Sequence, residues 1–208
     1  MFSKILLVIS SLFLCLCLHT WLNKRSVSQA EEQFGLLAQE LGVEMLEGEK
    51  EGETYPKLKG KIGGLDFELY VEYSNDKSSR PDQTVFTFRF PHYRIAQDLI
   101  IMPLRPLQKE SIATGIVGFD ELFSTYSSKG DSWVKTILTP ELAQDFVELR
   151  HSKLFYNGKF ELKDGLLLYQ RDYAAKFPKD KNQILAVIEI AKALLVNILM
   201  EYRNEIDF

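Results

Sequence analysis

Beyond Arg25 the sequence contains no cysteine, because Cys15 and Cys17 both lie near the N-terminus. The rest of the chain therefore has no disulfide and no cysteine-bound metal site. It also lacks any Asn-x-Ser/Thr sequence, so nothing in it directs N-glycosylation. These absences suit a cytosolic domain and equally suit many bacterial periplasmic domains.

The short motifs of several common enzyme classes are also missing. The sequence has no HExxH, GxxxxGK[ST], GxGxxG, GxSxG or EF-hand pattern, which leaves metalloprotease, nucleotide-binding and α/β-hydrolase chemistry without support. Its histidines, His19, His92 and His151, are not at metal-ligand spacing. We predict structural roles for His92 and His151 and assign no catalytic, cofactor-binding or metal-binding residue.

Charge is absent from Ile5 to Leu22, a run of 18 residues that spans about 27 Å as a helix. That length is close to the hydrocarbon thickness of a bilayer, and Trp21 stands where interfacial aromatic residues are found. We predict a retained signal anchor and a single-pass membrane protein. Two alternatives remain open: a signal peptide cleaved after Ser28-Gln29-Ala30, and a lipoprotein signal acylated at Cys15 or Cys17.

Basic residues are few beyond this anchor. Without Lys4, Lys24 and Arg25, 22 basic residues stand against 29 acidic residues, which gives a net charge of −7. This balance predicts no nucleic-acid partner and no docking to anionic lipid apart from the anchor. The same three basic residues flank both ends of the apolar run, so they assign no side of the membrane to the soluble domain.

Hydrophobic periodicity predicts helices at both ends of the soluble part. One helix is expected over residues 26–45, with Ser28 as its N-cap and with Phe34, Leu37, Leu41 and Met45 at helical spacing, and Gly42 is expected to loosen or end it. A long apolar helix is expected over 180–202. Glu189 and Lys192 lie within the second helix and argue against a second membrane span. Alternating residues and glycine-containing turns predict strands on both sides of Gly63-Gly64 and at 84–90, 98–104, 123–127, 153–157, 159–163 and 166–170.

This order of elements predicts the α+β class, with an N-terminal transmembrane helix followed by an antiparallel sheet covered by helices. We expect a signal anchor over residues 1–25, a helix and linker over 26–55, and an α+β soluble domain over 56–208.

Three carboxylates are the residues most open to a catalytic interpretation. Asp120, Glu121 and Asp131 lie close together in sequence, and clustered carboxylates can bind a cation or act as an acid–base pair. We interpret them as turn residues. Convergence of the three with His92 in a deep pocket would favour catalysis instead.

The surrounding residues have two interpretations as well. Tyr126, Lys129 and Trp133 could form a ligand-contacting edge, and we favour a solvated loop at 129–133. Phe119 and Phe123 are predicted to be buried. A helix is predicted to begin after the Thr139 cap, with Pro140 in its first turn.

The part of the sequence that contains these residues also resembles an uncharacterised bacterial family of membrane-anchored proteins that carry a domain of unknown function. The family pattern is F-D-x-x-F, then L-T-P, then a D-G turn. The resemblance covers about residues 85–178, and it departs from the family where Lys135 stands alone in place of an arginine-rich segment. The matching residues are Phe119, Asp120, Phe123, Ser127, Asp131, Leu138, Thr139, Pro140, Phe160, Asp164 and Gly165. The resemblance implies membrane association and no particular activity.

From these observations we expect a membrane-anchored, non-enzymatic domain that binds an unknown protein partner or assembles at the membrane. The alternative is an envelope-associated enzyme that uses the carboxylates near Asp120 and Asp131.

Overall fold

The computed structural model describes residues 15, 17, 18, 21, 25, 28–46, 55–72, 83–90, 98–104, 111–152, 158–171 and 178–206 of the 208-residue chain. Most of the Ile5–Leu22 run lies outside these described residues. So do His19, His92 and the strand predicted at 153–157.

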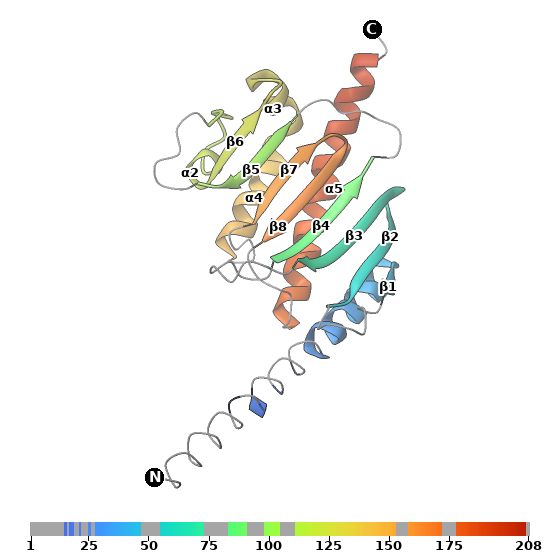
Figure 1. The fold of residues 1–208 in the computed structure, drawn as a ribbon. Coiled ribbons are helices and arrows are strands. Elements are labelled where there is room, and N and C mark those ends of the chain that lie inside the picture. The colour runs from blue at the N-terminus through green and yellow to red at the C-terminus, as the bar shows by residue number, and fades with distance from the viewer. Residues whose placement is uncertain are drawn as a thin grey trace, which may run out of the picture.

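The described strands form one eight-stranded sheet in which every recorded pairing is antiparallel (Figure 1). Their order across the sheet is β1-β2-β3-β4-β8-β7-β5-β6. The α+β class and the antiparallel sheet are thereby confirmed. The strands are β1 (Glu44–Leu46), β2 (Lys57–Ile62), β3 (Leu65–Glu72), β4 (Gln83–Arg89), β5 (Leu99–Pro103), β6 (Phe123–Ser127), β7 (Lys159–Lys163) and β8 (Leu166–Arg171).

Two of the predicted hairpin turns are confirmed. β2 and β3 are joined by Gly63 and Gly64, whose φ angles are 59° and 82°. β7 and β8 are joined by Asp164 and Gly165, with φ angles of 49° and 72°. Two consecutive positive φ angles match the right-handed twist of a hairpin, and they favour the Gly-Gly and Asp-Gly pairs found here.

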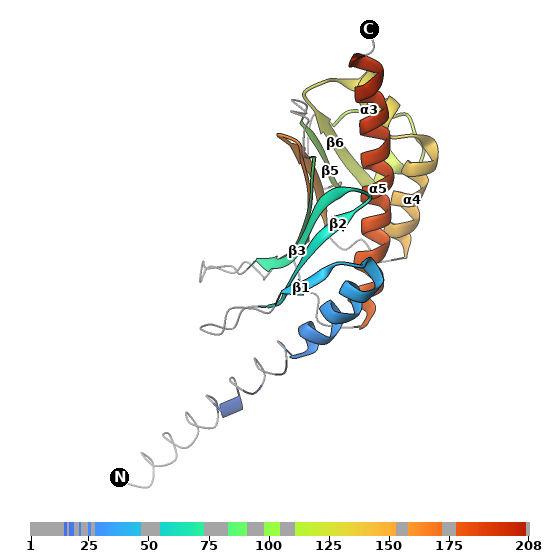
Figure 2. The same ribbon diagram turned by 90° about the vertical axis from the view of Figure 1, so that its right-hand side faces the viewer.

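The helices lie on one side of the sheet (Figure 2). A helix over residues 28–41 precedes β1. The others are α2 (Phe119–Leu122), α3 (Asp131–Ile137), α4 (Pro140–His151) and α5 (Pro178–Ile206). The predicted cap of α4 is confirmed, because Thr139 Oγ1 accepts a hydrogen bond from Leu142 N at 3.3 Å.

The first helix ends at Gly42 as predicted, because Gly42 adopts a φ of 65° and the chain continues into β1, so Met45 lies in this strand and not on the helix. One local prediction is wrong. The segment at 129–133 is not simply a loop, because α3 begins at Asp131. Trp133 and Val134 are buried in α3, so tertiary packing stabilises a helix too short to be stable alone.

Aromatic side chains fill the layer between the sheet and the helices. Phe86 stacks on Tyr169 with ring centroids 4.8 Å apart, and Phe160 lies 4.9 Å from the same ring. Phe146 of α4 meets Phe160 edge-on at 5.5 Å. All four side chains are almost fully buried, so the helices and the sheet share one core.

α5 is the described helix that is long and apolar enough to cross a membrane, over Lys181–Arg203 with mean hydropathy 1.9. This apolar helix is C-terminal, whereas we predicted a membrane helix at the N-terminus. The helix of this kind in the described part of the chain is therefore not the predicted one. In α5, Ile188, Ala191 and Leu194 are fully buried in the core. The prediction that this segment is a core helix is therefore supported.

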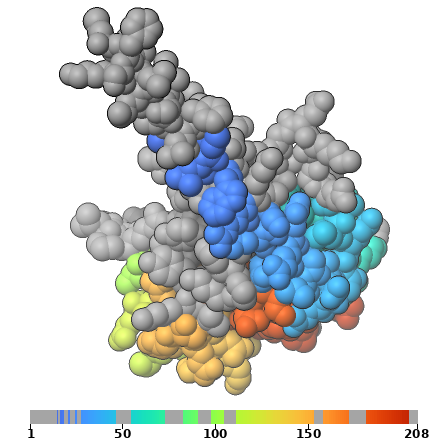
Figure 3. All heavy atoms as spheres, turned by 90° about the horizontal axis from the view of Figure 1, so that it is seen from below, coloured from blue at the N-terminus to red at the C-terminus, as the bar shows by residue number. Residues whose placement is uncertain are grey.

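The helix over residues 28–41 lies against the beginning of α5 (Figure 3). Phe34 and Leu37 are fully buried. Lys181 Nζ of α5 lies 2.6 Å from Glu40 Oε2. These contacts attach the segment that follows the predicted anchor to the main core.

Candidate functional site

Asp120 fixes the loop that precedes α2. Its Oδ1 accepts hydrogen bonds from Thr114 N at 3.1 Å and from Thr114 Oγ1 at 2.8 Å, and its Oδ2 accepts from Gly115 N at 2.9 Å. Thr114 Oγ1 accepts from Ile116 N, and the Ile116 carbonyl accepts from Phe119 N. Both carboxylate oxygens of Asp120 therefore hold backbone in place.

Residues 111–118, which we call the locked loop, are also attached to the outer edge of β6. Ile112 N donates to the Thr125 carbonyl at 2.8 Å, and Thr125 N donates to Ser111 Oγ at 2.9 Å. Val117 is 91% exposed on this loop. The locked loop thus presents an apolar side chain from a backbone that is fixed at several points.

The three candidate carboxylates do not converge. Asp120 and Glu121 belong to α2, whereas Asp131 begins α3, and the two helices lie at opposite ends of β6 (Figure 1). A five-residue strand spans roughly 17 Å. His92 lies outside the described residues. Within the described residues, Asp120 and Asp131 therefore lie too far apart to act together as an acid–base pair.

The other candidate side chains have structural surroundings. Trp133 is buried, with Lys129 Nζ 5.6 Å from its ring centroid, so it forms no open ligand edge. Tyr126 is half-buried on β6. His151 is exposed in the last turn of α4, where a positive charge is favourable. Within the described residues, no His, Cys, Asp or Glu cluster could hold a metal ion.

The sheet surface opposite the helices, which we call the open face, is covered by none of the described helices (Figure 2). It contains many paired charges. Glu68 lies 2.8 Å from Lys57 and 3.4 Å from Lys59. The hydrogen bond from Lys57 lowers the pKa of Glu68 against the opposing effect of burial. Burial raises the pKa of the neighbouring Tyr70, and the carboxylates of Glu72 and Glu68 add to this.

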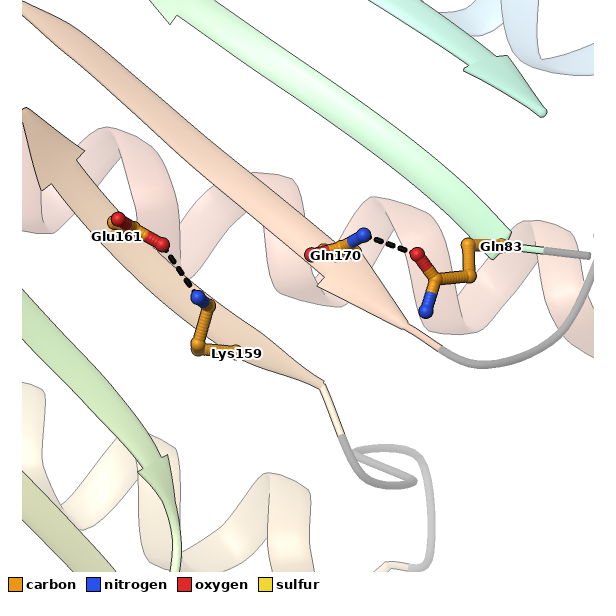
Figure 4. Close-up of polar contacts among 4 residues, drawn as sticks. All are labelled: Gln83, Lys159, Glu161 and Gln170. Atoms are coloured by element: carbon orange, nitrogen blue, oxygen red, sulfur yellow. Dashed lines mark hydrogen bonds and ion pairs between the residues drawn. The ribbon is translucent and has the colours of Figure 1, made fainter. Parts of the chain in front are cut away.

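A hollow of about 360 Å³ lies on the open face over β4, β7 and β8. Two of its lining residues have polar partners, because Glu161 pairs with Lys159 and Gln170 donates a hydrogen bond to Gln83 (Figure 4). No pattern in the sequence predicted this hollow. Strand alternation could place its residues on one face, but nothing local in the sequence predicts that β4 and β7 both flank β8.

No protein-family model and no curated protein sequence matches the chain. The resemblance to a family of unknown function therefore stays a prediction. The fold is similar to the crystal structure of the mycobacterial trehalose monomycolate transport factor A, TtfA, with a TM-score of 0.51 and 10% sequence identity. That match covers 81% of this chain and 95% of TtfA. At this identity, the similarity shows that the two proteins share a fold.

Proposed function

We propose that the protein is a membrane-anchored, non-enzymatic module, held in the membrane by Ile5–Leu22, that binds a protein partner through the locked loop. The anchor is supported by the length and apolarity of that run. The shared fold with TtfA adds support, because that protein is described as a transport factor. The envelope-associated enzyme is less well supported, since Asp120 and Asp131 lie apart.

The observation that carries this proposal is the exposure of Val117. Isolated apolar residues are common on protein surfaces, but this one projects from a loop that Asp120, Thr114 and Ser111 hold by hydrogen bonds. A fixed loop loses little conformational entropy on binding. Val117 is therefore held in a position from which it can enter an apolar pocket of a partner protein.

The surroundings of Val117 indicate the chemistry of the partner. Glu121 is exposed four residues further along the chain. Glu148 is exposed on α4 next to Val147, whose side chain would lie 4.0 Å from a Cβ added at Gly118. The soluble part is acidic overall, with a net charge of −7 beyond residue 25. A partner that presents an apolar pocket with a basic rim would be complementary to this surface.

The test is recovery of partners from detergent-solubilised membranes with the tagged full-length protein. Val117→Glu should lose a partner that the wild type retains. Because Val117 is exposed, its unfolding free energy should change by less than about 0.5 kcal/mol. Val196→Glu is the matched control, since Val196 is a 53% exposed valine on α5. Recovery of the same partners by Val117→Glu and the wild type would refute the role of the loop.

A further inference from the structure

The hollow on the open face has a floor of aliphatic side chains and a rim of charges. Leu166 and Leu168 project from β8 toward it and are half-buried. The remaining lining residues are Arg89, Glu161, Lys163, Asp164 and Gln170. A concave site with an apolar floor and a few polar groups is the usual form of a small-ligand site.

Most charged side chains of the open face already have partners. Lys57 and Lys59 contact Glu68, Lys61 contacts Asp66 at 3.7 Å, and Lys159 pairs with Glu161. Each of these four lysines already contacts a carboxylate, so none of them is as available to a ligand as a cation without an ion-pair partner.

Arg89 and Lys163 are different. Both are exposed, and neither forms an ion pair or a side-chain hydrogen bond within the described part of the chain. Asp164, in the β7–β8 turn, also lines the hollow and likewise has no ion-pair partner among the described residues. The lining charges without an ion-pair partner therefore sum to +1, which matches a ligand with a single negative charge.

The sheet register brings the two cations to one point. Arg89 of β4 and Lys163 of β7 are both directly opposite Leu166 of β8. Two strand spacings separate their Cα atoms by about 10 Å. Both side chains are long enough to reach over Leu166 from opposite sides and to share one anionic group above it.

We propose that this hollow binds a monoanionic amphiphile, with its phosphodiester or carboxylate held between Arg89 and Lys163 and its apolar part on Leu166 and Leu168. A charge-assisted hydrogen bond from each cation would hold the anion. The acidic balance of the soluble part disfavours general adsorption to anionic lipid. The site therefore selects a single head group by local geometry. It is separate from the locked loop.

The test is calorimetric titration of the full-length protein in a neutral maltoside detergent with dihexanoyl phosphatidylglycerol, a short-chain phosphodiester lipid. We expect saturable binding that the double variant Arg89→Gln/Lys163→Gln weakens at least tenfold. The matched control Lys59→Gln/Lys61→Gln removes the same charge from the same face outside the hollow, and it should bind as the wild type does.

Inorganic phosphate is the second arm of the experiment. Weaker binding of phosphate than of the lipid supports the amphiphile, whereas equal binding supports the anion site and assigns a free anion to it. The proposal fails if the Arg89/Lys163 variant binds within twofold of the wild type, or if the control loses as much affinity. Val117→Glu should leave the titration unchanged, so failure of the partner proposal would not mimic failure here.

Discussion

At the scale of single residues, close packing leaves little tolerance for added atoms. A Cβ added to Gly158 would overlap the Tyr169 side chain. That ring cannot move aside, because it is 1% exposed and lies between Phe86 and Phe160. Gly158 is therefore required by the sheet that surrounds it.

We predict that Gly158→Ala lowers the unfolding free energy by about 1–3 kcal/mol, the usual cost of overpacking a core. Gly35→Ala is the matched control. Gly35 lies within the helix over residues 28–41, and an added Cβ meets nothing within 4 Å. It should stabilise the protein by about 0.5–1 kcal/mol. Denaturant titration measures both, and equal effects would contradict the packing seen at Tyr169.

A second residue-scale prediction separates Asp120 of α2 from Asp131 of α3. Asp120→Asn should cost about 1–3 kcal/mol, because one amide oxygen cannot accept from Thr114 and Gly115 as two carboxylate oxygens do. Asp131→Asn should cost less than about 1 kcal/mol, because Asp131 is exposed and contributes mainly through the helix dipole. Denaturation of the two variants side by side decides this, and a larger loss at Asp131 would disprove it.

At the scale of elements, the β2–β3 hairpin has a charge arrangement that depends on pH. Lys57 and Lys59 from β2 both contact Glu68 on β3. Their effect is to lower the pKa of Glu68 in the folded protein below its ordinary value of 4.5. The hairpin is therefore more stable when Glu68 is ionised.

The stabilisation by Glu68 should be fully present above pH 4.5 and should disappear as the pH falls through the lower pKa of the folded state. The measurement is the unfolding free energy of the wild type and Glu68→Gln between neutral pH and about pH 3. The two proteins should differ near neutral pH and converge in acid. Lys57→Gln should weaken this pH dependence, and an unchanged difference in acid would contradict the assignment.

At the scale of the whole molecule, two apolar segments are candidates for the membrane anchor. The Ile5–Leu22 run has no charge. α5 is also apolar, with a mean hydropathy of 1.9 over Lys181–Arg203, yet its central residues Ile188 and Leu194 are fully buried in the core. A helix that stays packed in this core cannot also span a bilayer, so α5 is the weaker candidate for the anchor.

We predict that the protein stays in the membrane fraction after a high-salt wash. Leu12→Arg combined with Phe13→Arg should release it, because each arginine costs about 2.5–3.5 kcal/mol near the bilayer centre. Val196→Arg, on the exposed side of α5, should not. Release by Val196→Arg would show that α5 enters the membrane. A shortened product that begins near Glu31 would reveal a cleaved signal peptide instead.

The sequence by itself determined the local features of this protein. The Gly63-Gly64 and Asp164-Gly165 turns, the Thr139 cap and the apolar character of α5 follow from residues close together in the chain, because turn geometry, capping and periodicity are short-range effects. The tertiary structure alone decided how distant parts meet. Strand order depends on burying both β4 and β7 beside β8, which no local pattern specifies. That order brought Arg89 and Lys163 to opposite sides of Leu166. Folding of the loop onto α2 likewise brought Asp120 to the backbone N–H groups of Thr114 and Gly115 and to the Thr114 hydroxyl, which no local pattern predicted.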